Sequence, residues 1–243
     1  MELEQILKAY TEGKRNFSQI KLVESEIIKQ NLSNADFSGG DLRQSRLGLS
    51  NFTNCNFMET DLSETILWGT DLSFANLSNV LLRDADLSSA KLISANLQKA
   101  NLIKAILCGA NLTHAQLSDA IIIDADFRPN SDHRTNLSHA VLNNANLSYA
   151  NLSQALLYQA NLEEAKLCRS HLNTTNRYDN LATDLTQANL RGADLSYADL
   201  TGAILFKADL QGADLTGTIL KDVDLRGAIM PDGTIMDDRV SKS

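Results

Sequence analysis

A repeat of five residues runs through almost the whole chain and restricts its fold more than any other feature. In the segment Ser88–Asn111, leucine recurs at every fifth position and alanine stands two positions before each leucine. On an α-helix each step of five turns the leucines by about 140° and spreads them around the helix. On a straight strand an odd period sends them to alternate faces. Neither regular element therefore fits the repeat.

Alanine and leucine two residues apart share one face of an extended chain, so each repeat is predicted to be a short extended piece followed by a corner. Corners that all bend the same way wind the chain into a coil with alanine and leucine inside. The sequence thus predicts an all-β solenoid. Its predicted core includes Leu92, Leu97, Leu102, Leu107, Ala95 and Ala100.

The repeat frame is strict, and it resembles a known family. From Phe17 to Leu172 every fifth residue is hydrophobic except Asp132, and from Leu185 to Ile235 none fails. Short internal repeats of this kind identify repeat architectures. The tandem pattern Ala-(Asn/Asp)-Leu-x-x resembles the pentapeptide repeat family. The resemblance implies a right-handed quadrilateral β-helix with four repeats per coil, and hence a rod about 50 Å long.

The chain is expected to divide into a cap, a β-helix and a tail. Residues 1–16 are predicted to form an N-terminal capping helix and linker, because apolar residues recur at helical spacing over Met1–Tyr10 and Gly13 follows as a stop. A cap is expected because a first coil otherwise leaves its core and edges bare. A partner-binding or membrane-surface helix is the alternative. The β-helix is predicted over residues 17–236 and a tail over 237–243.

Two irregular loops are predicted within the β-helix, at 128–136 and 173–184. The first places Asp132 in a central slot, and in the second the hydrophobic frame shifts. Since the coils are alike, a partner that binds at one position of the rod is expected to recognise the segments where the repeat pattern is broken. The first loop would offer a neutral-to-basic patch to an acidic partner surface, while the alternative is a tolerated insertion without function. The candidate binding residues are Arg128, Asp132, His133, Arg134, Arg177, Tyr178 and Asp179.

A second candidate surface is an exposed apolar strip. Apolar residues occupy several outward positions that are otherwise polar, and a coil of 20 residues would bring them to one side of the rod. Contiguous apolar patches indicate binding surfaces, although isoleucine also simply suits a β surface. Val141 would join the strip only if the first loop preserves the register. The candidate residues are Leu81, Ile103, Ile121 and Ile123, flanked by Trp68.

No catalytic, metal or cofactor site is predicted. The 4 histidines are scattered, without cysteine or carboxylate at metal-ligand spacing. Aspartates and serines recur at repeat positions, where they are expected to bond corner backbone groups rather than to form a catalytic pair. The 3 cysteines show no CxxC spacing, and the N-terminus resembles no secretion signal, so a reduced cytoplasmic protein is expected. No apolar run is long enough for a membrane-spanning helix. We therefore expect a non-enzymatic protein.

Several stretches that depart from the consensus resemble cyanobacterial members of the pentapeptide repeat family that regulate heterocyst differentiation. The resemblance implies a regulator that acts by protein contact, with the master transcription factor HetR as the expected partner. It implies no direct binding to nucleic acids or membranes. It also implies that the protein is a monomer or weak dimer. The stretches are AYTEGKRNF, LRQSRLG, ILWGTDLS, ANLIKAILCGANL, FRPNSDHRTNL, AKLCRS and KDVDLRGAIMPDGTIMDD.

The alternative function within the family is mimicry of DNA to bind DNA gyrase or topoisomerase. The chain carries a net charge of −8 with basic residues interspersed. DNA carries one charge per ~1.7 Å, so a 50 Å mimic would match about 30 phosphates. The charge of this chain is a weak imitation of that density. A direct nucleic-acid binder is less favoured still, because no basic stripe is present.

Overall fold

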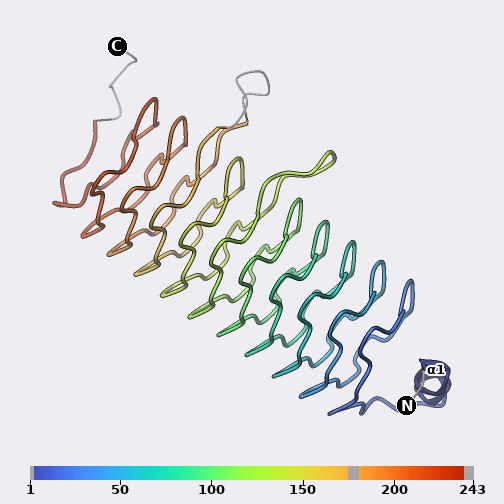
Figure 1. Cartoon of the computed structure of the whole chain (residues 1–243). Coiled ribbons are helices and arrows are strands. Elements are labelled where there is room, and N and C mark those ends of the chain that lie inside the picture. The colour runs from blue at the N-terminus through green and yellow to red at the C-terminus, as the bar shows by residue number, and fades with distance from the viewer. Residues whose placement is uncertain (1–2, 175–180, 238–243) are drawn as a thin grey trace.

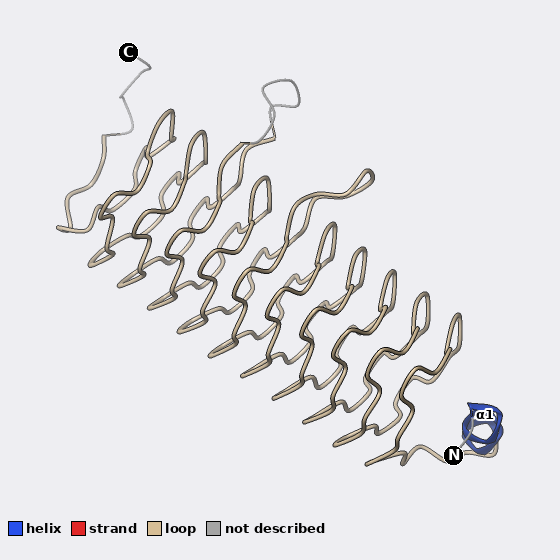
Figure 2. Ribbon diagram, in the orientation of Figure 1, coloured by secondary structure: helices blue, strands red, loops and turns tan. Residues whose placement is uncertain are grey.

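The computed structural model describes residues 3–174 and 181–237. One helix, α1 (Leu3–Thr11), precedes a straight rod of stacked four-sided coils, with the two ends of the chain at opposite ends of the rod (Figures 1 and 2). The helix that the sequence predicted at Met1–Tyr10 is thus present within the described residues. None of the helices in these ranges is long and apolar enough to cross a bilayer.

Parallel β-bridges between residues 20 apart hold successive coils together. Asn101, for example, pairs with Leu81 in the coil before and with Ile121 in the coil after. Each coil has four sides, and we name the faces A, B, C and D after consecutive central residues of one coil. These central residues are Leu97 on face A, Leu102 on face B, Leu107 on face C and Leu112 on face D. Coils are numbered from Phe17, which is the first central residue of face A.

The repeat works because it satisfies every backbone amide. In the repeat Asn101–Ala105, three amides donate to carbonyls of neighbouring coils, one closes the corner turn, and one donates to the side chain of Asn101. The pairs are Asn101 N to Val80 O at 2.9 Å, Leu102 N to Ile121 O at 2.7 Å, Ile103 N to Asn101 Oδ1 at 3.2 Å, Lys104 N to Ile123 O at 3.0 Å and Ala105 N to Leu102 O at 3.0 Å.

The preference for Asn or Asp before the central residue follows from the same bonds. Their side-chain oxygen caps the amide two residues on, as in Asp86 Oδ1 and Ser88 N at 2.9 Å. The sequence prediction that the aspartates bond corner backbone groups is therefore confirmed. Each corner also needs one residue with positive φ, and Lys99 and Lys104 both adopt φ 58 without being glycine. That conformation costs roughly 1 kcal/mol, which the surrounding ladder of hydrogen bonds offsets.

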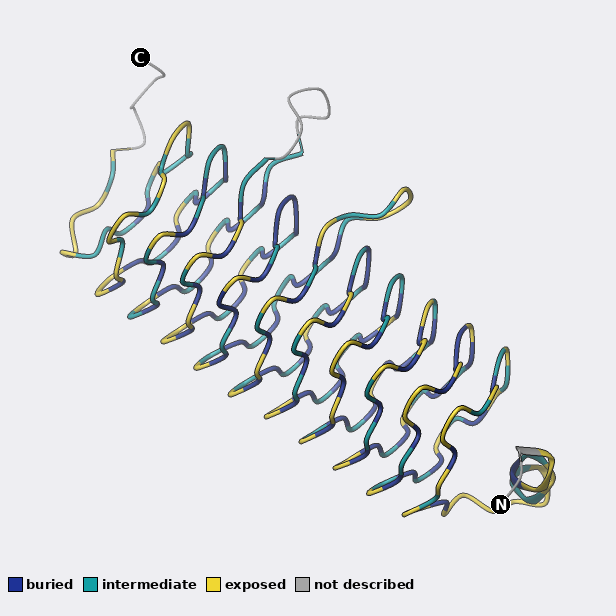
Figure 3. Cartoon of the chain, in the orientation of Figure 1, coloured by how far each residue is buried: buried dark blue, intermediate teal, exposed yellow. Residues whose placement is uncertain are grey.

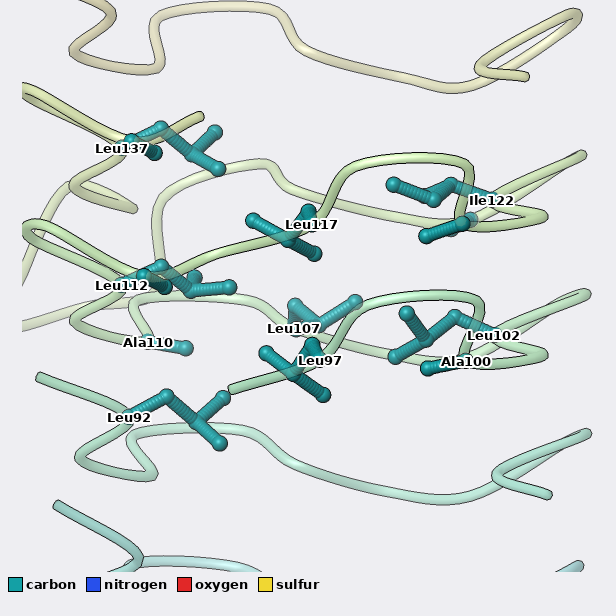
Figure 4. Close-up of a cluster of buried hydrophobic side chains, with 14 of the residues drawn as sticks. Leu92, Leu97, Ala100, Leu102, Leu107, Ala110, Leu112, Leu117, Ile122 and Leu137 are labelled. Carbon is teal, nitrogen blue, oxygen red and sulfur yellow. The ribbon is translucent and has the colours of Figure 1, made fainter. Parts of the chain in front are cut away.

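The core is a narrow column of the central residues, with the small residues of the repeat packed beside them (Figure 4). Leu92, Leu97 and Ala100 are fully buried. Where a hydroxyl replaces alanine, it donates to a backbone carbonyl, either of the preceding coil, as Thr60 Oγ1 does to Phe37 O at 2.9 Å, or of its own coil, as Thr65 Oγ1 does to Leu62 O at 2.6 Å. In the described part of the chain, no buried side-chain nitrogen or oxygen lacks a partner. The polar side chains buried in the described part of the column are therefore hydrogen-bonded.

The first coil is covered by α1. Ile6 is fully buried against the core, and the Tyr10 hydroxyl donates to Ser33 O at 3.0 Å. Phe17 and Leu22 are only 3% exposed as a result. The helix therefore occupies the place of a cap.

Two insertions interrupt the register. Asn111 pairs with Asn136, 25 residues away, and Leu156 pairs with Asp184, 28 residues away. The insertions are thus five and eight residues long. The first does not preserve the register, because Val141 pairs with Gln116 on face A. Val141 is therefore removed from the face of Ile121, where it would have joined the predicted apolar strip.

Candidate interaction surface

Both insertions leave the rod at the same corner, between faces C and D, in coils 6 and 8. The first projects from the upper edge of the rod in Figure 1, and the described ends of the second leave the same edge two coils further on. Figure 3 shows that the projecting tip of the first insertion is exposed while its base is half-buried. The departures from the repeat are thus gathered on one side of the molecule.

Each insertion returns to the core through a buried threonine. Thr135 Oγ1 accepts a hydrogen bond from Gly109 N at 2.8 Å, and Thr183 Oγ1 accepts one from Gln154 N at 2.8 Å. Both threonines occupy the small inner position of the repeat and have no exposed surface. The chain therefore re-enters the regular coil at these two threonines.

Asn130 anchors the first insertion onto the preceding coils. Its Nδ2 donates to Ser89 Oγ at 2.7 Å, and its Oδ1 accepts from the backbone of Asp132 and His133 at 2.9 and 2.7 Å. A Cβ on Gly109 would lie only 2.2 Å from Asn130 Nδ2, so glycine is required at this corner. The insertion is thus held in one conformation by a side chain within it.

Arg134 joins the two insertions. Its Nε donates to Gln154 O at 2.7 Å, and its Nη2 donates to Ala182 O at the return of the second insertion. Burial lowers the pKa of the guanidinium, although Asp184 opposes this shift. Because the guanidinium donates hydrogen bonds to these two backbone carbonyls, Arg134 connects the corner across three coils.

Arg128 is also engaged within the molecule. Its guanidinium lies 2.7 Å from Asp126 Oδ2, in a two-pronged pair. Burial would raise the pKa of Asp126, but the hydrogen bonds from Arg128 outweigh it and hold that pKa below its ordinary value. The free basic patch that the sequence suggested is therefore altered, since both arginines have partners. Asp132 and His133 remain exposed at the tip.

The candidate residues of the second loop, Arg177, Tyr178 and Asp179, lie outside the described residues. The described parts of that loop are its two ends. Thr174 Oγ1 donates to Thr201 O at 3.1 Å in the next coil, and Ala182 accepts the bond from Arg134. Both ends of the second insertion are thus tied to the rod.

The predicted apolar strip is interrupted. Leu81 and Ile121 are about 40% exposed on face B, but Asn101 lies between them in the bridge column. Ile103 and Ile123 occupy the next column and are half-buried. The structure therefore brings these residues to one face without making a continuous apolar patch.

Trp68 lies on the neighbouring face C with 47% of its surface exposed. Ile66 and Ile106 are exposed on the same face, and Asp86 separates them in the bridge column. The apolar residues of faces B and C thus alternate with polar ones along the rod.

Sequence reasoning missed a stack of Tyr149, Arg169 and Tyr197 at the corner between faces B and C. The five-residue frame places residues 149 and 169 at equivalent corners 20 residues apart. Tyr197 reaches the same column only because the second insertion adds eight residues. The length of the insertion could have been predicted from the repeat frame. The corner of the coil at which it lies could be assigned only from the structure.

Histidine, cysteine and carboxylate side chains do not gather into a metal-binding cluster on the described surface. Over residues 3–174 and 181–237, no group of three or more histidine, cysteine or carboxylate side chains is placed to hold a metal ion. The rings of His114 and His139 stack with their centroids 4.8 Å apart. The described coils are held in register by parallel β-bridges and present regular outer faces.

A family model of pentapeptide repeats matches the chain in 8 copies. The matched residues are 31–69, 70–107, 90–128, 135–173 and 183–222. No protein with a curated description matches the chain.

Among solved structures, the chain is similar to HetL, a pentapeptide repeat protein involved in heterocyst differentiation regulation from the cyanobacterium Nostoc sp. strain PCC 7120. The two share 56% identity over 97% of this chain and 100% of HetL, with a TM-score of 0.96. A second Nostoc PCC 7120 pentapeptide repeat protein is 28% identical over 41% of this chain and 80% of its own, with a TM-score of 0.39. QnrB1, a plasmid-mediated fluoroquinolone resistance protein, is 19% identical over 85% of this chain and 91% of its own, with a TM-score of 0.45.

The family model and the likeness to HetL confirm the fold that the sequence predicted, a right-handed quadrilateral β-helix with a short N-terminal helix. The family model matches the repeats before and after each insertion, from residue 31 to residue 222, and leaves out residues 129–134 and 174–182. This chain belongs to the pentapeptide repeat family.

Proposed function

We propose that this chain is a non-enzymatic, protein-binding regulator of heterocyst differentiation in the cytoplasm, and that it acts by contacting the transcription factor HetR as a monomer or weak dimer. The observation that carries the proposal is the 56% identity with HetL over the full length of that chain. HetL is described as involved in heterocyst differentiation regulation. A likeness of this extent leaves only 3% of this chain outside the match.

The architecture supports a binding role. A rod of equivalent coils offers little to distinguish one position from another, whereas loops on a rigid scaffold commonly carry recognition. Here the loop corner is held by Asn130 and braced by Arg134, so its shape is set before a partner arrives. A pre-organised surface loses less conformational entropy on binding. The corner between faces C and D in coils 6 to 8 is therefore the proposed contact.

The side chains best suited to catalysis have structural tasks instead. Asp86 caps a backbone amide, and Asp126 both caps an amide and pairs with Arg128. Cys55 is buried, and burial raises the pKa of its thiol to about 12, so it is a weak nucleophile at neutral pH. These roles support a protein that binds rather than catalyses.

Binding of purified HetR to the immobilised chain tests the proposal, and the register of the insertions permits a sharp variant. Deletion of 129–133 leaves Phe127-Arg128-Arg134-Thr135-Asn136-Leu137, which is one regular corner. Deletion of 175–182 likewise restores a regular corner around Thr183. Each deletion should keep the β-helix and weaken HetR binding at least tenfold.

Lys99→Glu provides the matched control, because Lys99 is exposed at a corner of faces A and B and its change should leave binding intact. Absence of HetR binding by the unaltered chain would contradict the proposal. Native affinity in both deletion variants would move the contact away from the loop corner. Inhibition of gyrase supercoiling by the unaltered chain would instead favour the DNA-mimicking function.

A further inference from the structure

The corner between faces B and C carries an aromatic and cationic stack across coils 7, 8 and 9. The Arg169 guanidinium lies 5.9 Å from the ring centre of Tyr149 and 5.7 Å from that of Tyr197. Its Nη1 also lies 3.3 Å from the Tyr149 hydroxyl. Both rings are half-exposed or more, at 50% and 59%. We call these three residues the Tyr-Arg-Tyr ridge.

The backbone seats the ridge firmly. All three residues occupy the left-handed corner position, with φ 63, 57 and 58. The ring of Tyr197 lies over Gly217, where a Cβ would come within 2.7 Å of the ring. The absence of a side chain on Gly217 thus lets the last ring lie flat against the next coil. The stack is consequently pre-organised along the rod axis.

Among the described residues, the guanidinium of Arg169 has no carboxylate partner. In the described part of the chain, no acidic oxygen lies within 4.0 Å of it. Other surface arginines, such as Arg43 and Arg128, each pair with a neighbouring aspartate at 2.8 or 2.7 Å. The Arg169 guanidinium therefore lies between two tyrosine rings, and its outer edge has no carboxylate partner among the described residues.

The groups that flank Arg169 on faces B and C favour the binding of an anionic ligand. In the same coil, Lys166 and His171 are exposed on the two adjoining faces. In the next coil, Asp194 and Asp199 stand beside Lys166 and His171 in the bridge columns. Asp199 is already bonded by Asn173 Nδ2 and Thr201 Oγ1, each at 2.6 Å. On faces B and C of coil 8, Lys166 and Arg169 are thus the cationic groups, whereas Glu163 and Glu164 of the same coil lie on face A and at its corner with face B.

Face C connects the ridge with the two insertions. In coils 7 to 9 it is bordered by the ridge at one corner and by the loop corner at the other. Its floor is polar and bonded, with Ser153 Oγ donating to Asn173 Oδ1 at 2.8 Å and Asn173 bonded in turn to Asp199. A partner that lay on this face would touch both borders.

We propose that the Tyr-Arg-Tyr ridge is a docking site for an acidic segment of a protein partner. A carboxylate of that segment pairs with the outer edge of the Arg169 guanidinium, and the tyrosine rings pack against its methylene groups. Tyrosine and arginine are the residue types that most often dominate binding energy at interfaces, and a carboxylate matches the guanidinium fork. For the identity of the partner, this inference rests on the proposed function; the chemistry of the ridge does not.

A peptide titration tests the ridge without the partner. The probe is a capped hexapeptide of alternating glutamate and glycine, added to the 15N-labelled full chain, with the Arg Nε–Hε resonances followed by NMR. The Arg169 resonance should shift in a saturable way and return toward its free position in high salt. The same peptide with glutamine should leave it unmoved, and Arg43, which is held by Asp41, is the internal control.

Two variants refine the titration. The double variant Tyr149→Ala/Tyr197→Ala should weaken peptide binding at Arg169 at least threefold, because the apolar walls are lost. Lys207→Glu reverses a charge at the diagonally opposite corner and should change nothing. An Arg169 shift no larger than that of Arg43, or an unchanged affinity in the double variant, would overturn the inference.

HetR binding then separates the two proposals. Arg169→Glu should weaken HetR binding at least tenfold, while Lys207→Glu should bind as the unaltered chain does. Native HetR affinity in Arg169→Glu would overturn the ridge as part of that contact and leave the proposed function standing. A chain that does not bind HetR but shows the peptide response would refute the proposed function and retain the ridge.

Discussion

At the residue scale, one central leucine shows how the repeat produces stability. Leu102 is 1% exposed and lies in the column of central residues, while Asn101 beside it faces outward. Leu102→Ala should lower the free energy of unfolding by about 3 kcal/mol, because it removes buried methyl groups and leaves a cavity. Chemical denaturation measures this loss.

Asn101→Ser is the matched control for Leu102→Ala. A serine hydroxyl can still accept the bond from Ile103 N, so the change should cost less than about 1 kcal/mol. Leu102→Asp should prevent folding altogether, since a buried carboxylate has no partner there. A folded Leu102→Asp protein of unchanged melting temperature would refute the assignment of inward and outward positions.

Cys55 gives the fold a dependence on alkaline pH. Burial raises the pKa of its thiol from 9.0 in the unfolded chain to about 12 in the folded one. Above pH 9 the unfolded state has released a proton that the folded state keeps, so this contribution to stability is complete below pH 9 and is lost as the pH rises toward 12. Urea denaturation between pH 8 and 11 should show a slope of up to about 1.4 kcal/mol per pH unit.

Cys55→Ala should flatten that slope. A smaller alkaline slope should remain in this variant, because burial also raises the pKa of the Cys108 thiol to about 12. The contribution of Cys108 is expected to be smaller because its thiol is only half-buried. An alkaline slope of equal size with and without Cys55 would contradict the account.

The sequence determined much at this scale. The period of five identified which side chains point inward, including Leu92 and Ala100, because any other assignment would expose the whole frame. It could not show that Thr135 and Thr183 take the small inner position at the end of each insertion. That assignment depends on how long each insertion is before the chain returns to the core.

At the element scale, the two insertions behave as one unit through Arg134. Arg134→Met keeps the length and apolar stem of the side chain but removes its bonds to Gln154 O and Ala182 O. Hydrogen exchange at residues 129–133 and 181–183 should become at least tenfold faster, because charge-assisted bonds of this kind are worth roughly 1.5–3 kcal/mol.

Arg128→Met is the control for Arg134→Met. Because the Arg128 side chain is exposed, loss of its pair with the half-buried Asp126 should cost no more than about 1 kcal/mol and leave the second insertion unaffected. If exchange near residue 182 were the same in Arg134→Met as in the unaltered chain, the two insertions would not be coupled.

The placement of the insertions was only partly predictable. Asp132 in a central slot and the shifted frame before Leu185 located both loops in the sequence. That they share one corner follows from counting repeats per coil, which the residues alone do not provide. The bracing by Arg134 could not be predicted, because its acceptors are backbone carbonyls, which carry no sequence signature.

At the scale of the whole molecule, the rod presents its individual features on one side. The ridge lies at one corner of face C and the insertions at the other, over coils 6 to 9. The interrupted apolar residues of faces B and C lie nearer the N-terminal end. A partner bound at face C and a partner bound at the apolar residues of faces B and C would protect different backbone amides from hydrogen exchange.

Hydrogen exchange of the full chain with and without HetR tests the account most directly. A contact on face C should slow exchange at 128–136, 149–154, 169–174 and 197–202, and leave the face A segments 96–99 and 141–144 unchanged. Protection of residues 81–83, 101–103 and 121–123 alone, or no protection anywhere, would contradict it.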